Sequence, residues 1–194
     1  MKVIGVTGGS GSGKSAFCGF LAELGAAVVD ADKISHSTIL RGGAAFDEIV
    51  SAFGREILGA DGEIDRKTLG KIVFSSAEKL ALLNEITHKH IFKEMRLEIE
   101  CKNRDIVLLD VPLLFSDDFP IEYDLSIAVI ADLQTRIERI TARDKISRDA
   151  ALARISAQMS DREMAARADI CVDNSRGTDE LKEKATHIYN IIKQ

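Results

Sequence analysis

The sequence predicts an α/β protein built on a parallel five-stranded sheet with crossover helices. Short apolar stretches rich in β-branched residues alternate with helical patterns along the chain, and this alternation is typical of parallel sheets. Residues 106–111 are almost continuously apolar, as expected for a strand covered by helices on both faces. A glycine-rich turn directly follows the first predicted strand, as in many nucleotide-binding α/β proteins.

Each element has its own local pattern. Residues 14–24 carry apolar side chains at i, i+3, i+4 and i+7, which predicts a helix, and Gly25 suits its end. Asp132 and Thr178 stand where they would cap two later helices. Strands are predicted at residues 2–7, 27–29, 106–111, 125–131 and 170–172.

The stretch of residues 33–104 is too long for a single crossover connection. It contains several helical patterns, so we expect a helical insertion that forms a substrate subdomain. The core then comprises residues 1–32 and 105–194.

Composition narrows the class of protein. The chain has 194 residues, 45% hydrophobic, with a net charge of −5, which suits one core with a modest insertion and is unlike a dedicated nucleic-acid binder. No apolar run is long enough to cross a membrane and the first residues do not resemble a signal peptide, so we expect a cytoplasmic protein. The three cysteines are far apart, and we expect all of them to be reduced and buried.

Residues 8–15, Gly-Gly-Ser-Gly-Ser-Gly-Lys-Ser, match the phosphate-loop pattern G-x-x-x-x-G-K-[ST] between a predicted strand and a predicted helix. Backbone N–H groups of such a loop face an anion together with the positive end of the helix. Lys14 would reach the β- and γ-phosphates, and the hydroxyl of Ser15 would ligate Mg²⁺. A purine nucleoside triphosphate with Mg²⁺ is the predicted ligand.

Carboxylates follow two of the predicted strands. Asp30 and Asp32 share one side if the extended backbone continues, and either could accept a proton from an attacking hydroxyl. A helix cap or an ion pair is the alternative for both. Asp110 ends the apolar strand, where an acid often helps to hold Mg²⁺. The alternative is that Asp110 is simply an acidic residue in the turn that precedes Pro112.

Seven arginines gather between residues 133 and 167 of this acidic chain. Helical lids of small-molecule kinases supply such side chains to a transferring phosphoryl group. For any one arginine, local pairing with Glu138 or Asp144 on a solvated face is the simpler explanation, but for the cluster as a unit we expect a lid. His88 and His90 do not share a helix face, so a zinc site is not expected. The arginines are Arg136, Arg139, Arg143, Arg148, Arg154, Arg162 and Arg167.

Together these residues resemble the dephospho-CoA kinase family over nearly the whole chain. The phosphate loop is shared by many kinases, but Asp-Ala-Asp at 30–32 and Val-Pro-Leu-Leu-Phe at 111–115 make the match specific. Further matching stretches are Asp65-Arg66, residues 83–88, Arg143-Asp144, Arg154-Ile155, Ala157-Gln158, Ala168-Asp169 and Asp173-Asn174.

The resemblance implies a three-layer P-loop kinase core, a helical insertion that binds the CoA substrate, and a helical lid at about residues 139–165. It implies transfer of the γ-phosphoryl group of ATP to the ribose 3′-hydroxyl of dephospho-CoA, giving CoA and ADP in the final step of coenzyme A biosynthesis. A monomer or weak homo-oligomer with no nucleic-acid or membrane partner is expected.

The resemblance also assigns roles to residues. Asp32, the expected general base, would act with Lys14 and Arg143 in catalysis. The nucleotide would be held by Gly9, Gly11, Ser12, Gly13, Lys14, Ser15, Ala16, Arg139 and Asn174. The acceptor would contact Asp32, Arg66, His88, Pro112 and Leu113. Mg²⁺ would be held by Ser15 and Asp110, partly through water.

Three residues depart from the family pattern: Ala16 replaces the usual Thr, Lys89 the usual Pro and Ser116 the usual Glu. Two alternatives remain, which are a P-loop kinase for another nucleoside or nucleotide and a nucleotide binder without transfer activity. A guanine-nucleotide switch is not indicated, because the N-K-x-D and D-x-x-G motifs are absent.

Overall fold

The structure is a computed structural model that describes all 194 residues and divides them into two compact units. The first unit comprises Met1–Asp30 with Lys102–Gln194, and the second comprises Ala31–Cys101. The second unit begins at Ala31 because a helix starts directly after the second strand.

The first unit is built on one five-stranded sheet in the order β2-β3-β1-β4-β5, with every pair of neighbours parallel. This confirms the predicted α/β class and parallel sheet. All residues of β3 are buried, as its continuous apolar sequence predicts. The strands are β1 (Lys2–Thr7), β2 (Ala27–Asp30), β3 (Ile106–Asp110), β4 (Leu125–Ile130) and β5 (Ile170–Asp173).

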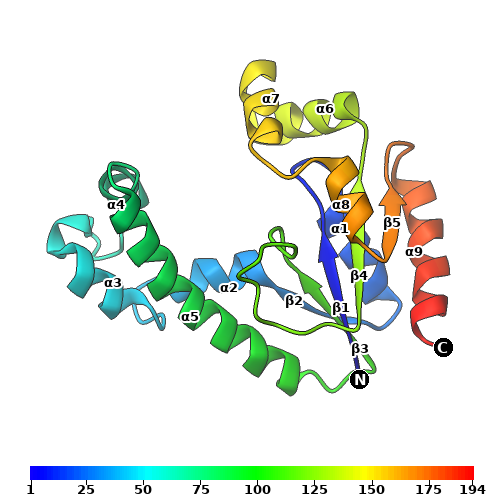
Figure 1. Cartoon of the computed structure of the whole chain (residues 1–194), viewed down its shortest axis with the longest axis horizontal. Coiled ribbons are helices and arrows are strands. Elements are labelled where there is room, and N and C mark those ends of the chain that lie inside the picture. The colour runs from blue at the N-terminus through cyan, green and yellow to red at the C-terminus, as the bar shows by residue number, and fades with distance from the viewer. The chain divides into compact units, whose positions relative to one another are not determined.

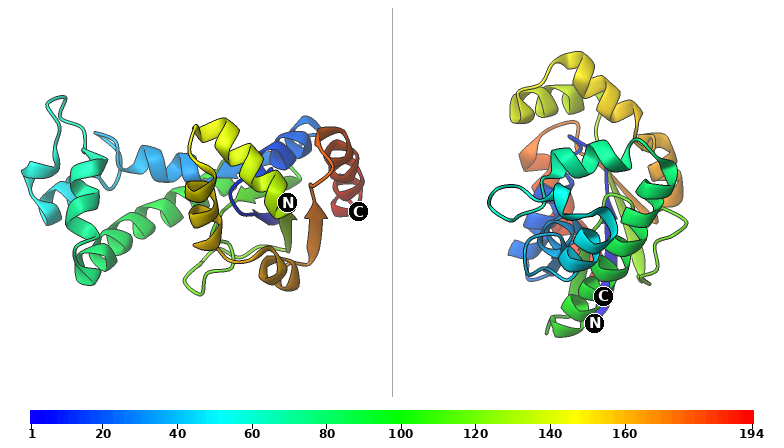
Figure 2. Two further views of the ribbon diagram at one scale, coloured as in Figure 1. Left: turned by 90° about the horizontal axis from the view of Figure 1, so that it is seen from above. Right: turned by 90° about the vertical axis from the view of Figure 1, so that its left-hand side faces the viewer.

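Five helices belong to this unit. α1 and α9 lie side by side and share one core with the sheet, which includes Phe17, Leu21 and Leu181 (Figure 2). α6 and α7 pack on one another through a small core of their own beyond the carboxyl ends of the strands (Figure 1). The helices are α1 (Lys14–Glu23), α6 (Leu133–Asp144), α7 (Arg148–Ser156), α8 (Asp161–Arg167) and α9 (Thr178–Ile192).

Helix ends follow the sequence in most places. Gly25 follows α1 with φ 116°, as expected of a helix stop. Asp132 caps α6, since its carboxylate accepts the N–H of Thr135 at 2.9 Å. The prediction for Thr178 is wrong: it is the first residue of α9, and Gly177 with φ 101° is the cap. The turn before α9 needs a positive φ, which glycine adopts without strain.

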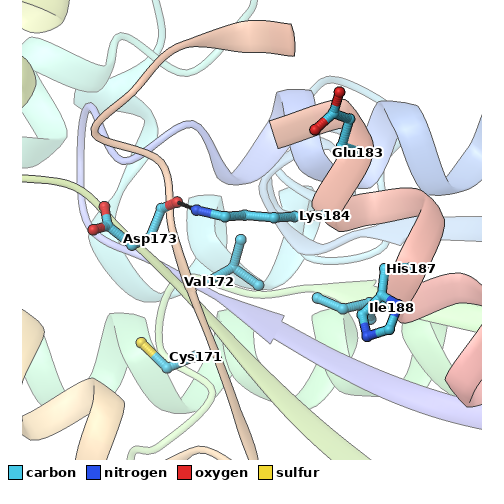
Figure 3. Close-up of a pocket in the computed structure, with 7 residues that line it drawn as sticks. All are labelled: Cys171, Val172, Asp173, Glu183, Lys184, His187 and Ile188. Atoms are coloured by element: carbon cyan, nitrogen blue, oxygen red, sulfur yellow. Dashed lines mark hydrogen bonds between the residues drawn. The ribbon is translucent and has the colours of Figure 1, made fainter. Parts of the chain in front are cut away.

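The expectation of three buried cysteines is also wrong. Cys18 is buried, whereas Cys101 and Cys171 are exposed. Cys101 is the last residue of helix α5 (Ala77–Cys101), and Cys171 lies on β5 at the edge of the sheet. A cavity of about 470 Å³ lies between β5 and α9, and Cys171 lines it (Figure 3).

The second unit is helical and has its own core, which includes Ile49, Phe53, Leu69 and Ile86. Asp65 caps α4 by accepting the N–H groups of two residues of its first turn. None of the helices in the structure combines the length and the apolar character that spanning a membrane requires. The elements of the second unit are α2 (Ala31–Thr38), α3 (Phe46–Phe53), the 3₁₀ turn η1 (Arg55–Ile57), α4 (Arg66–Val73) and α5 (Ala77–Cys101).

Candidate nucleotide-binding site

The phosphate loop occupies residues 8–13 between β1 and α1. Gly11 and Gly13 have φ angles of 79° and 94°, which glycine adopts without strain. A Cβ atom at Gly8 would lie 2.5 Å from the carbonyl oxygen of Val129, so the loop packs closely on the end of β4. The glycines expected from the motif are therefore required by this backbone path.

The loop presents backbone N–H groups as the motif predicts. The N–H of Ser12 donates to the carbonyl of Gly9 at 3.1 Å, and that of Ser10 donates to Gln158 Oε1 at 2.9 Å. The N–H groups of Gly11 and Gly13 have no acceptor within the protein. Together with the first turn of α1 they form a cluster of donors suited to a phosphate.

Lys14 and Asp110 lie together at the end of the loop. The Lys14 ammonium forms an ion pair with Asp110 Oδ1, and both side chains are at most 10% exposed. Asp30 is aligned with Asp110 in the β2–β3 register, so two carboxylates end neighbouring strands. Ser15 stands in the first turn of α1.

These oxygen donors suit Mg²⁺, which takes one or two protein oxygens together with water and phosphate oxygens. No group of three or more His, Cys, Asp or Glu side chains in the structure could enclose a metal ion. Ser15 and Asp110 therefore fit a magnesium ion that arrives with a nucleotide, and they do not form a closed metal cage.

Arg139 and Asn174 hold the loop through its carbonyl groups. Arg139 Nη1 donates to the carbonyls of Gly11 and Ser12 at 3.2 and 3.3 Å, and its Nη2 donates to the carbonyl of Asn174 at 2.9 Å. Asn174 Nδ2 donates to the carbonyl of Ser12 at 2.7 Å. Direct contact of these two side chains with a nucleotide stays a prediction.

Arg136 does not lie on the solvated face that is the simpler expectation for any one arginine of the stretch. It is 3% exposed, and its guanidinium donates to the carbonyl of Ser10, to Asp161 and to Gln158. The sequence carried a signal for this, since Arg136 is adjacent to Ile137 and four residues before Ile140, both of which are buried. Gln158 was not predicted as a site residue.

Arg143 is 64% exposed and pairs with Asp144 at 2.7 Å. Asp144 also pairs with Arg154 of α7, and hydrogen bonds from these two guanidinium groups lower the pKa of Asp144 to about 2. Arg143 makes no bond to the phosphate loop in the structure. Its catalytic role stays a prediction.

A cavity of about 190 Å³ adjoins the loop. Pro112 is held there because its carbonyl accepts the hydroxyl of Thr7 at 3.1 Å. Leu113, a predicted acceptor residue like Pro112, is 68% exposed and lines the same cavity. The full lining is Thr7, Gly8, Gly9, Pro112, Leu113, Phe115, Ser116, Ala157, Gln158, Met159 and Met164.

The remaining predicted residues belong to the second unit. Asp32 is exposed in the first turn of α2, two residues after the end of β2. Arg66 is the exposed first residue of α4. The ring of His88 on α5 lies 5.3 Å from that of Phe92.

One departure from the family pattern has a partner within this unit. Lys89 pairs with Glu48 of α3 at 3.3 Å, and His90 contacts the same carboxylate at 2.8 Å. These hydrogen bonds, that from His90 above all, hold the pKa of Glu48 below its usual range. Lys89 therefore ties α5 to α3.

The fold and the loop define a P-loop nucleotide-binding α/β protein of the kinase type. The family model for dephospho-CoA kinase matches residues 2–180. A dephospho-CoA kinase of Carboxydothermus hydrogenoformans is 41% identical over 187 residues, covering 95% of this chain and 91% of the other. One of Fusobacterium nucleatum is 40% identical and covers 99% of both chains. The chain belongs to the dephospho-CoA kinase family.

Solved structures agree with this assignment. A dephospho-CoA kinase from Campylobacter jejuni is 27% identical with a TM-score of 0.63, covering 98% of this chain and 97% of that one. A protein from Thermus thermophilus is 31% identical with a TM-score of 0.86, covering 98% and 96%. A shikimate kinase from Acinetobacter baumannii, 16% identical with a TM-score of 0.55 and covering 99% and 93%, shares the fold.

Proposed function

We propose that this protein transfers the γ-phosphoryl group of ATP to the ribose 3′-hydroxyl of dephospho-CoA, which yields CoA and ADP. The observation that carries the proposal is membership of the dephospho-CoA kinase family over residues 2–180. The phosphate loop, the Lys14–Asp110 pair and the adjoining cavity support it. We place the enzyme in the cytoplasm, acting as a monomer or weak homo-oligomer.

In the proposed reaction the 3′-oxygen forms a bond to the γ-phosphorus while the bond from that phosphorus to the β–γ bridging oxygen breaks, and ADP leaves. The carboxylate of Asp32 takes the hydroxyl proton. Lys14 and the loop N–H groups bind and orient the triphosphate, and Arg143 of the lid offsets charge on the transferring group. Mg²⁺, held by Ser15 and Asp110, would supply charge neutralisation of the phosphate oxygens when bound.

The acceptor assay tests this function directly. Purified protein is incubated with ATP, Mg²⁺ and dephospho-CoA, and the acceptor is read by mass spectrometry. A gain of one phosphate that depends on both substrates is the expected result. Transfer to a nucleoside or nucleotide from a panel, but not to dephospho-CoA, would overturn the proposal in favour of another kinase. Nucleotide binding with no transfer to any acceptor would overturn it in favour of a binder.

The Asp32→Asn variant tests the general base. Because such a base contributes about 10²–10⁴ to the rate, we expect kcat to fall by about 10² or more while the Kd for ATP stays within about twofold. Asp47→Asn is the matched control, since Asp47 is also an exposed aspartate in the first turn of a helix of the second unit. Retained turnover in Asp32→Asn would remove Asp32 from this role without affecting the acceptor assay.

A further inference from the structure

Gln158, in the connection between α7 and α8, bonds to the phosphate loop through both ends of its carboxamide. Its Oε1 accepts the N–H of Ser10 at 2.9 Å, and its Nε2 contacts the hydroxyl of Ser10 at 3.1 Å. Its Oε1 also accepts Arg136 Nη2 at 3.1 Å. No polar atom of this side chain is left without a partner.

Arg136 completes the connection. Its Nε donates to the carbonyl of Ser10 at 2.9 Å, and its Nη1 donates to Asp161 at 2.7 Å, the first residue of α8. The side chain is only 4% exposed, so these bonds are shielded from water and are costly to break. One buried guanidinium therefore joins the loop, the α7–α8 connection and the start of α8.

The same contacts fix the path of the loop before any ligand binds. A Cβ atom at Gly9 would lie 2.3 Å from Arg136 Nη2, so the guanidinium occupies the space beside this residue. Both the N–H and the carbonyl of Ser10 are engaged. Ser10 therefore offers no free N–H to a phosphate, whereas the N–H groups of Gly11 and Gly13 are left for one.

We propose that Gln158 and Arg136 are positioning residues that hold the first half of the phosphate loop in its binding shape and link it to the α7–α8 segment. Gln158 also lines the cavity that holds Pro112 and Leu113, so movement of that segment changes the loop and the cavity together. The proposal rests on the proposed function only in taking ATP as the nucleotide.

Gln158→Met is the principal variant, because methionine keeps the length of the side chain and removes its hydrogen bonds. We expect the Kd for a non-hydrolysable ATP analogue with Mg²⁺, measured by calorimetry without acceptor, to rise about tenfold, which corresponds to about 1.4 kcal/mol. In the transfer assay the KM for ATP should rise similarly while kcat at saturating ATP changes less than about twofold.

Ser10→Ala gives an independent check. It removes only the hydroxyl contact, so the Kd should rise about twofold to threefold, within the range of one weak hydrogen bond. In the Gln158→Met background it should add nothing, because the contact is already gone. Gln134→Met is the matched control, since the side chain of Gln134 bonds only to Glu138 on the exposed side of α6.

Three results would overturn the proposal. The first is a Kd of Gln158→Met for the ATP analogue that lies within twofold of the parent value. The second is full additivity of the effects of Gln158→Met and Ser10→Ala on this Kd. The third is a fall in melting temperature and kcat with an unchanged KM, which a purely structural role produces. The binding measurement needs no acceptor, so failure to phosphorylate dephospho-CoA would refute the proposed function and leave this test intact.

Discussion

Replacing Gly13 by alanine tests how tightly the loop is packed against the end of β5. Gly13 is the cap of α1 with φ 94°, and a Cβ atom there would lie 2.0 Å from Asn174 Nδ2. Asn174 is 4% exposed and donates to the carbonyl of Ser12 at 2.7 Å. An added methyl group must therefore displace a buried amide from its acceptor.

The expected cost has two parts. A non-glycine residue in the left-handed region costs about 1–2 kcal/mol. Displacing the Asn174 amide leaves buried polar groups unpaired, which costs about 1–3 kcal/mol. For a chain of this size each kcal/mol lowers the melting temperature by about 2–4 °C, so Gly13→Ala should melt on the order of 10 °C lower.

Gly177→Ala is the matched control. Gly177 also precedes a helix with a positive φ, of 101°, but nothing lies within 4 Å of the position of its Cβ atom. Gly177 has ψ −175°, outside the left-handed helical region, so Gly177→Ala should lose only the cost of this backbone conformation, about 1–3 kcal/mol or a few degrees. Melting is followed by circular dichroism in the absence of nucleotide.

Combining Gly13→Ala with Asn174→Ala separates contact from backbone strain. The shortened side chain leaves room for the new methyl group, so the double variant should lose clearly less stability than the sum of the two single changes. The reasoning fails if the two losses simply add, or if Gly13→Ala melts at the same temperature as Gly177→Ala.

Two further predictions concern ionisable groups. With a thiol reagent at pH 8, exposed Cys101 should react first, and Cys171 should react more slowly because partial burial raises the pKa of its thiol. Burial raises the pKa of Cys18 to about 12, so Cys18 should react only on unfolding. Peptide mass spectrometry that finds Cys18 modified in the native protein would contradict this. Hydrogen bonds from the Ser126 side chain and N–H hold the pKa of Asp169 below its usual range. The stability that this contact contributes is present above the ordinary pKa of an aspartate and is lost as the pH falls below it. Between pH 5 and pH 3, the free energy of unfolding measured with urea should therefore fall more for the parent than for Asp169→Asn. Equal losses would refute the assignment.

The sheet and the phosphate loop could be predicted from the sequence because both depend on local patterns. Continuous apolar residues identify β3, and the glycine spacing identifies a loop with positive φ at Gly11 and Gly13. The cap at Asp132 needs only an acceptor a few residues before the N–H it binds. In each case the residues that decide the conformation are close together in the chain.

The support of the loop could not be predicted in this way. Arg136 lies 126 residues from Ser10 and Asn174 lies 162 residues from Ser12, and no local pattern joins such partners. The position of Arg136 beside Ile137 and Ile140 signals the buried face of α6, but it does not identify the partners from other segments on which burial of a charge depends. The errors for Thr178 and the cysteines have a similar cause, since turn geometry and edge position are set by the assembled fold.

The contacts of α6 indicate why its arginines should not be treated alike. Ordering a glycine-rich loop costs conformational entropy, and Arg136 and Arg139 offset that cost by binding the carbonyls of Ser10, Gly11 and Ser12. Engaging these carbonyls helps to leave backbone N–H groups available to an anion. A guanidinium has five N–H donors, so Arg139 keeps donors besides those that bind the loop carbonyls. The service of Arg143 to a transferring phosphoryl group stays a prediction, but this side chain is exposed and bonded only to Asp144, so it takes no part in holding the loop.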